Sequence, residues 1–230
     1  MTAERAIEWI DLGHMHYDEA LERQLARSRA LLAEQDNQQT IYMVEHPPTI
    51  TIGRNGTTDN IVASEAFLEE NGFTVRHVDR GGDVTYHGPG QLVVYPVLHL
   101  APWNNDVKAY VRNLEESVIR SLATVNIHAT RHADYPGVWV GDAKICAVGA
   151  RVQKRPSGEF VTYHGIALNL NTNLDHFSTI VPCGIRDKEV TSVAKELGEA
   201  VDFSDWQTRV KAAFIEVFNE QGLYQNERKV

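Results

Sequence analysis

Residues 137–149 read G-V-W-V-G-D-A-K-I-C-A-V-G, two apolar runs rich in β-branched residues and separated by the pair Gly141-Asp142. Glycine followed by a polar residue suits the two central positions of a type II′ turn, so the pattern predicts a tight β-hairpin. A second turn signal, Arg155-Pro156-Ser157-Gly158, closes the next hairpin. The middle of the chain therefore folds back and forth as neighbouring antiparallel strands.

Hydrophobic periodicity predicts helices on either side of this region. Apolar residues recur at helical spacing over 21–32 and 107–122, and Ser64 to Glu70 form a shorter helix before Gly72. A further helix begins near Ser204, whose spacing to Gln207 fits a capping box. The predicted strands are Ile41–Val44, Thr49–Gly53, Thr74–Val78, Gln91–Leu100, Val138–Val140, Ala143–Val152 and Glu159–Leu170.

Strands and long helices do not alternate regularly along the chain, as they would in a doubly wound parallel sheet. We therefore expect an α+β fold with a mixed, mostly antiparallel sheet and helices packed on it. Pro96 lacks a backbone N–H, so its strand should be irregular or lie at an edge. Length and the absence of linkers favour a single domain over residues 1–230.

Composition narrows the classes of function. The net charge is −9, from 31 acidic and 22 basic residues, which argues against a nucleic acid partner. No apolar run approaches the roughly 18 residues of a membrane span, and the N-terminus lacks a signal-peptide pattern. The two cysteines form no C-x-x-C pair. We expect a cytoplasmic protein with free thiols and no membrane partner.

Residues 80–92 read R-G-G-D-V-T-Y-H-G-P-G-Q-L. Four glycines and a proline are costly in a regular element, but they allow the backbone to approach a ligand closely. They bracket the alternating segment Asp83–His87. The pattern indicates a loop and a strand that line a ligand site.

Cys183 lies in the sequence Val181-Pro182-Cys183-Gly184, where proline and glycine favour a sharp turn that exposes the sulfur. Cys146 is the alternative nucleophile, because alternation places it on the same strand face as Lys144. It lies in an apolar, β-branched strand, however, where a buried hydrophobic role fits better.

These segments, with Tyr163–Asn169, closely resemble the lipoyl(octanoyl) transferases from about Thr51 to Ser192. The resemblance implies the fold of biotin and lipoate protein ligases, and an enzyme that needs no metal or cofactor. It implies that octanoyl or lipoyl groups move from acyl carrier protein through a cysteine thioester to a lysine of lipoyl domains. Such domains occur in the E2 subunits of 2-oxoacid dehydrogenases and in the glycine cleavage H protein.

The resemblance also assigns residues. Cys183 is implied as the nucleophile and Lys144 as the acid and base. The implied substrate-binding residues are Arg80, Gly81, Gly82, Asp83, Val84, Thr85, Tyr86, His87, Ala147, Val148, Gly149, Gly165, Ile166 and Ala167. Their small side chains leave room for an aliphatic tunnel.

A lysine beside the thiol would explain the chemistry, because only about 3% of free cysteine is thiolate at neutral pH. Backbone N–H groups from 82–85 or from Cys183 are candidate oxyanion donors. An acidic carrier protein also requires a local basic patch. Two sets of residues are candidates: Arg151, Lys154 and Arg155 in one predicted hairpin, and Arg76, His77 and Arg80 before the glycine-rich segment. Two alternatives stay open: an ATP-dependent lipoate or biotin protein ligase, and a noncatalytic module that binds a carrier protein.

Overall fold

The computed structural model describes residues 7–181 and 189–223, with side chains up to residue 220. Its larger sheet has the order β1-β2-β6-β10-β9-β8-β7, with β11 paired to β9. These strands are β1 (Ile7–His14), β2 (Gln39–Glu45), β6 (Gln91–Val97), β7 (Thr130–Arg131), β8 (Gly137–Val140), β9 (Ala143–Lys154), β10 (Phe160–Asn169) and β11 (Glu189–Val190). The pairs β1–β2 and β11–β9 are parallel and the others antiparallel. The predicted mixed, mostly antiparallel sheet is confirmed.

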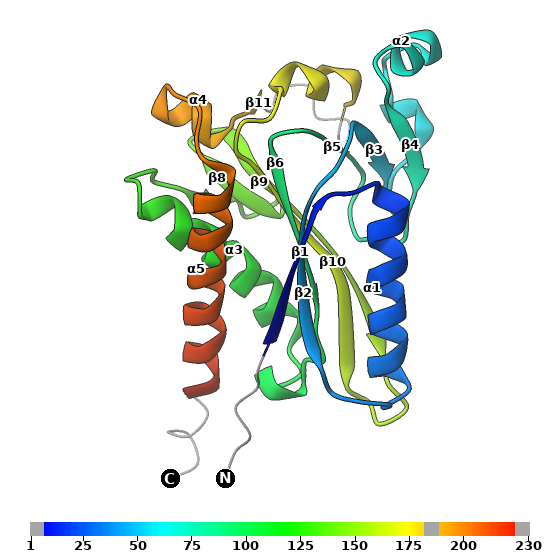
Figure 1. Ribbon diagram of the computed structural model, residues 1–230, viewed down its shortest axis with the longest axis vertical. Coiled ribbons are helices and arrows are strands. Elements are labelled where there is room, and N and C mark those ends of the chain that lie inside the picture. The colour runs from blue at the N-terminus through cyan, green and yellow to red at the C-terminus, as the bar shows by residue number, and fades with distance from the viewer. Residues whose placement is uncertain (1–6, 182–188, 224–230) are drawn as a thin grey trace.

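A smaller sheet has the order β4-β3-β5 and lies at one end of the molecule (Figure 1). Its strands are β3 (Thr49–Ile52), β4 (Thr74–His77) and β5 (Val84–His87). β5 is the alternating segment that the sequence placed at a ligand site. Ile50, Val84 and Tyr86 belong to the separate core of this sheet.

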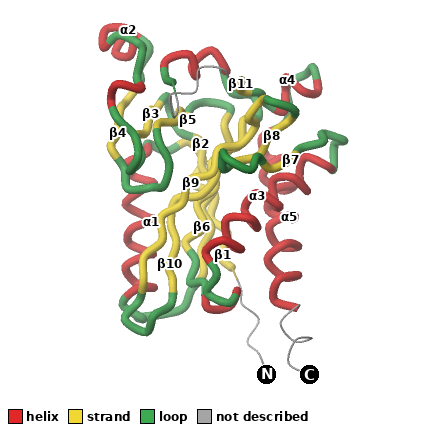
Figure 2. The backbone as a smooth tube through the Cα atoms, turned by 180° about the vertical axis from the view of Figure 1, so that it is seen from behind, coloured by secondary structure: helices red, strands yellow, loops and turns green. Residues whose placement is uncertain are grey.

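Helices cover both faces of the larger sheet (Figures 1 and 2). α1 (Tyr17–Leu32) packs on one face, and α3 (Val107–Ala123) and α5 (Phe203–Leu223) pack side by side on the other. The shorter helices are η1 (Thr58–Asn60), α2 (Glu65–Glu70), η2 (Ala101–Trp103), η3 (Leu174–Thr179) and α4 (Val193–Leu197). Among the described residues, no helix is both long and apolar enough to cross a membrane.

The N-terminal caps of two helices test local predictions. The helix predicted from Ser64 to Glu70 forms as α2, and Ser64 is its N-cap, since its side chain accepts a hydrogen bond from the Phe67 N–H at 3.2 Å. The capping box at Ser204 is wrong. Asp202 caps α5 instead, accepting from the Asp205 N–H at 2.7 Å and from the Ser204 hydroxyl. A carboxylate at this position also interacts favourably with the helix dipole.

The hairpin at Gly141-Asp142 forms as predicted. Val140 pairs with Ala143, and of the two turn residues only Gly141 has a positive φ, +56°, as a type II′ turn requires. The turn directs β9 back along β8 and starts the strand at Ala143 and Lys144. The turn therefore fixes the position of Lys144 opposite Trp139 of β8.

Of the two possibilities expected for the strand with Pro96, irregular pairing or an edge position, the structure shows irregular pairing. β6 lies between β2 and β10, so it is no edge strand, but its ladder with β10 is irregular. The regular register ends at Ile166 and Val94, and His164 adopts a φ of +56°. Thr162 Oγ1 donates to the Pro96 carbonyl at 2.9 Å, which replaces part of the lost pairing. Proline is tolerated here because the regular ladder with β10 ends at Val94, before Pro96.

Candidate active site

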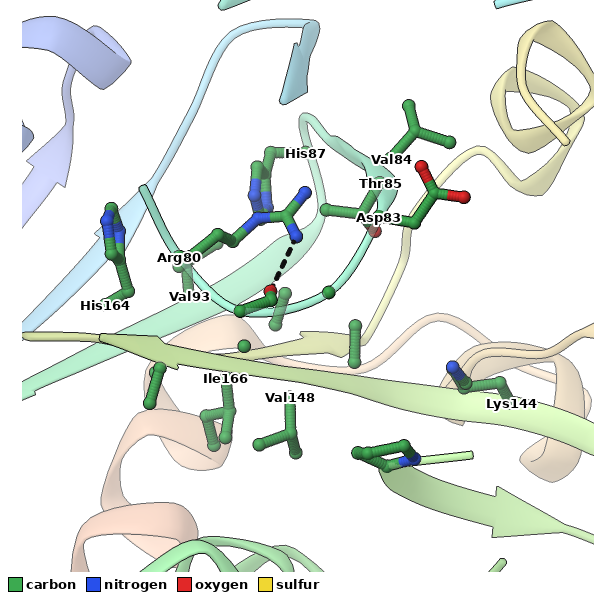
Figure 3. Close-up of a pocket in the computed structure, with 18 of the residues that line it drawn as sticks. Arg80, Asp83, Val84, Thr85, His87, Val93, Lys144, Val148, His164 and Ile166 are labelled. Atoms are coloured by element: carbon green, nitrogen blue, oxygen red, sulfur yellow. Dashed lines mark hydrogen bonds between the residues drawn. The ribbon is translucent and has the colours of Figure 1, made fainter. Parts of the chain in front are cut away.

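A cavity of about 380 Å³ lies between the two sheets, within the roughly 300–1,000 Å³ of typical small-molecule sites. The segment Arg80–Asp83 and β5 of the smaller sheet cover it, and β6, β9 and β10 of the larger sheet form its floor. Figure 3 shows Arg80 and His87 on one side of β9 and β10, with Lys144 towards the other end of the site. All implied substrate-binding residues line this cavity except Tyr86.

Tyr86 was implied as a substrate-binding residue, but it does not line the cavity. Its ring is fully buried in the core of the smaller sheet, and its hydroxyl is hydrogen-bonded to His176 Nδ1 at 2.7 Å. Alternation places Thr85 and His87 on the opposite side of β5, where they line the cavity. Val84, on the side of Tyr86, borders the cavity at the start of the strand. Tyr86 supports the covering strand from behind.

The floor of the cavity is built from small residues. Ala147, Gly149, Gly165 and Ala167 line it. Val148 and Ile166 also border the cavity, but their side chains point to the other side of the strands in Figure 3. Ile166 belongs to the core beneath α3 and α5, and Val148 packs against that core.

Glycine at 149 allows the covering segment to lie directly on the sheet. A Cβ on Gly149 would lie 3.1 Å from the Gly81 carbonyl oxygen, and the Gly81 N–H donates to the Ala150 carbonyl at 3.0 Å. The segment Arg80–Asp83 and β5, which form the roof of the cavity, are thus joined to its floor at this point.

Arg80 fastens the roof to the smaller sheet. Its side chain is buried, and its guanidinium donates to the Thr51 carbonyl at 2.7 Å and to Thr51 Oγ1 at 2.9 Å. A third contact, at 3.1 Å, goes to the Gly81 carbonyl. The sequence implied that Arg80 binds substrate, and these contacts give it a supporting role in shaping the site as well.

Asp79 lies behind the cavity lining and supports His164, a role that the sequence did not predict. Its carboxylate accepts from His164 Nε2 at 3.1 Å and from the Tyr163 hydroxyl, and it pairs with Arg151 Nε at 3.3 Å. The hydrogen bond from His164 is the main reason that the pKa of Asp79 falls to about 2. Asp79 directly precedes the glycine-rich motif, and this position was the only signal in the sequence.

Lys144 lines the cavity at the start of β9. Its Nζ lies 4.9 Å from the centre of the Trp139 ring. Val190 of β11 pairs with Lys144, and Thr191 donates its N–H to the Lys144 carbonyl at 3.0 Å. β11 also brings Glu189 to the cavity lining.

Cys183 lies outside the described residues. The described residue before this segment is Val181, whose N–H donates to the Asn60 carbonyl at 2.8 Å. The described residue after it is Glu189, which pairs with Ala143, the neighbour of Lys144. The chain therefore re-enters the described fold beside Lys144.

Cys146 has the buried hydrophobic role that its strand indicated. It is fully buried in the core, and burial raises the pKa of its thiol far above the ordinary value. The expectation that it shares a face with Lys144 is wrong, since Lys144 lines the cavity and Cys146 does not. The register of β8 and β9 shifts between Val138 and Trp139, and this irregularity interrupts the alternation.

Arg151, Lys154 and Arg155 do not form the expected basic patch. Arg155 is only 5% exposed, and its guanidinium is bound by the Leu31 carbonyl at 2.7 Å and by Glu159 at 3.2 Å. Arg151 pairs with Asp79. Of the three residues, only Lys154 is exposed. Within the described ranges, no group of three or more His, Cys, Asp or Glu side chains could hold a metal ion.

The family model of the lipoyl protein ligase A/B catalytic domain matches residues 15–215. An octanoyltransferase of Caldicellulosiruptor bescii is 47% identical over 212 residues, which cover 91% of this chain and 90% of the relative. The chain belongs to the lipoyl protein ligase A/B family. An octanoyltransferase of Parabacteroides distasonis is 43% identical and covers 90% of the chain and 96% of its own length.

Solved structures with low sequence identity show that this chain has the fold expected from its sequence, that of lipoate and biotin protein ligases. A lipoate-protein ligase A bound with ATP has a TM-score of 0.67 and 18% identity, covering 94% of this chain and 84% of the ligase. A biotin protein ligase from Aquifex aeolicus in complex with biotin and ATP has a TM-score of 0.52 and 15% identity, with 93% and 71% covered.

Proposed function

We propose that this chain is an acyltransferase that moves an octanoyl group onto protein lysines in protein lipoylation. The carrying observation is the cavity itself: small residues form its floor, and Lys144 stands at one end. Relatives of nearly the same length, at 43% and 47% identity, are octanoyltransferases. Burying each methylene of an aliphatic chain contributes about 0.8 kcal/mol, so such a floor supplies much of the recognition.

The proposed reaction has two half-reactions that share one site. The Cys183 thiolate attacks the octanoyl thioester of acyl carrier protein, the carrier thiol leaves with a proton, and an octanoyl-cysteine thioester remains. The amine of an acceptor lysine then attacks this thioester. It loses a proton as the amide forms, and the Cys183 thiolate is released. Lys144 gives the first proton and takes the second.

Electrostatics supports pairing Lys144 with Cys183. At about 4 Å and an effective dielectric near 20, an ammonium and a thiolate attract by about 4 kcal/mol before desolvation. Lowering a thiol pKa by about 1.5 units requires roughly 2 kcal/mol. The chain on the C-terminal side of Cys183 pairs with β9 beside Lys144, which is consistent with this dyad.

The proposed donor is octanoyl-acyl carrier protein, and the proposed acceptors are lipoyl domains of 2-oxoacid dehydrogenase E2 subunits and the glycine cleavage H protein. One solved neighbour, at 21% identity, is a bipartite lipoate protein ligase from Thermoplasma acidophilum, described with its E2 lipoyl domain. The protein ligases on this fold are the second candidate, because the fold neighbours include ATP-bound enzymes.

Intact mass spectrometry after mixing with octanoyl-carrier protein tests the proposal. We expect a hydroxylamine-labile octanoyl adduct without ATP, lost in Cys183→Ser and kept in Cys146→Ser. The matched cysteine variant controls for any general effect of removing a thiol. An adduct that requires ATP would favour a ligase, and loss of the adduct in Cys146→Ser alone would refute Cys183 as the nucleophile.

A further inference from the structure

A chain of hydrogen bonds fixes the proton on His87. Asn169 Nδ2 donates to the Thr191 carbonyl at 3.0 Å, and Asn169 Oδ1 accepts from Gln91 Nε2 at 3.0 Å. Gln91 Nε2 also donates to the Tyr86 carbonyl at 3.1 Å. Backbone carbonyls only accept, so both amides have one orientation. Gln91 Oε1 then accepts from His87 Nδ1 at 2.8 Å, which places the proton of the ring on Nδ1.

His87 is a neutral imidazole. Its side chain is 5% exposed, and burial is the main reason that its pKa falls to about 3. With the single proton on Nδ1, Nε2 carries a lone pair and acts only as an acceptor. Among the residues that the structure describes, none is hydrogen-bonded to Nε2.

The polar neighbours of His87 are already engaged. Tyr17 stacks on its ring with centroids 5.8 Å apart, and the Tyr17 hydroxyl lies 3.5 Å from His164 Nδ1. His46 meets the ring edge-on at 5.9 Å, and its Nε2 accepts from the Tyr95 hydroxyl at 2.9 Å. Neither hydroxyl is directed at His87 Nε2. The acceptor belongs to a residue that lines the cavity, where a ligand can reach it.

His87 lies with Arg80 and His164 on the side of the site opposite Lys144 in Figure 3. Under the proposed function, the carbonyl of the acyl group lies at Lys144, so the distal carbons extend towards His87. A purely aliphatic chain gives the Nε2 lone pair no donor, and a buried acceptor without a donor weakens a complex.

We propose that this site also takes acyl chains that carry an O–H or S–H donor near their distal end, with His87 Nε2 as the acceptor. This inference rests on the proposed function, and it concerns which acyl groups the site selects. A hydroxylated chain and a thiol-bearing chain share the required chemistry. The hydroxyl is the stronger donor, so the two sources differ in the size of the effect.

Competition between carrier-bound donors tests the inference. Octanoyl, 6-hydroxyoctanoyl, 8-hydroxyoctanoyl and 8-mercaptooctanoyl carrier proteins compete for one acceptor domain, and mass spectrometry gives the ratios of kcat/KM. A net hydrogen bond is worth about a factor of ten in such a ratio. We expect at least one hydroxylated chain to exceed octanoyl by about tenfold, and the thiol to show a smaller gain.

Variants locate the effect. His87→Phe should bring the ratios to about one, because it removes the acceptor. His176→Phe should keep the ratios of the parent, because His176 does not line the cavity. Wild-type ratios of about one for every substituted chain would refute the inference even if His87→Phe does not fold. So would parental ratios in a folded His87→Phe.

Calorimetric titration with free octanoic and 8-hydroxyoctanoic acids separates this inference from the proposed function. If no octanoyl transfer occurs, the proposed function fails. A roughly tenfold tighter binding of the hydroxy acid, lost in His87→Phe, would then still support His87 as the acceptor. Equal affinities for the two acids in that case would refute it.

Discussion

Lys144 is the second residue of β9 and Lys154 is its last, so they offer a matched comparison. Lys144 lines the cavity beside Trp139, whereas Lys154 is exposed at the far end. We expect Lys144→Ala to lower kcat for octanoyl transfer by about 100-fold or more, because both half-reactions lose their proton carrier. Lys154→Ala should transfer at the parental rate. Single-turnover rates, with circular dichroism to check the fold, measure both; near-normal turnover of Lys144→Ala would remove it from the mechanism.

The Asp79 carboxylate should give the folded protein a characteristic pH dependence. Its pKa falls from an ordinary value near 4 to about 2, mainly through the hydrogen bond from His164. A depressed pKa in the folded state contributes stability above the unfolded pKa, and this is lost as pH falls through the folded pKa. The free energy of unfolding of the parent should therefore exceed that of Asp79→Asn at pH 5 and above. Urea titrations should show the difference shrinking between about pH 4 and pH 2, and a constant difference would contradict the role of the charge.

The sequence predicted a feature correctly where the residues of that segment alone determine its conformation. The Gly141-Asp142 turn is an example, because its dihedral requirements are local. Cys146 shows the limit, since a register shift against β8 removed it from the face of Lys144, and no pattern within β9 encodes that shift. Pro96 is similar: its central position depends on the interrupted ladder with β10, a strand that comes much later in the chain. Asp79 was missed because its partners come from β9 and β10.

The close approach of β10 to β6 at Gly165 gives a prediction at the scale of the element. A Cβ on Gly165 would lie 2.2 Å from the Val94 carbonyl oxygen and 2.6 Å from Pro96 Cδ, so the central strands would have to separate. We expect Gly165→Ala to lower the free energy of unfolding by about 3 kcal/mol or more. Gly13→Ala is the control: its φ is +59°, but nothing lies within 4 Å, so its cost should be near 1 kcal/mol. Equal losses in urea titrations would show that β6 and β10 adjust freely.

At the scale of the whole molecule, the site requires both sheets. The roof belongs to the smaller sheet through β5, and the floor to the larger one. They are joined by the Gly81 N–H to the Ala150 carbonyl, and the side chain of Glu45 accepts from the Gly90 N–H at 2.7 Å. The smaller sheet has three strands of only four residues each, so its own core is small and buries little apolar surface. Its stability should therefore depend on the larger sheet.

This dependence makes a prediction about unfolding, and it tests whether residues 1–230 form a single domain. The four tryptophans, Trp9, Trp103, Trp139 and Trp206, all lie on elements of the larger sheet or on its covering helices, so their fluorescence reports that part alone. Phe67→Trp, on the partly exposed face of α2, adds a probe beside the smaller sheet. We expect the added signal to change at the same urea concentration as the parental fluorescence and the circular dichroism, because one cooperative unit loses both sheets together.

The parent protein, followed by circular dichroism, controls for any destabilisation by the new side chain. An earlier transition seen only by the added tryptophan would mean that the smaller sheet unfolds by itself, and that the roof of the cavity can be lost while its floor stays folded.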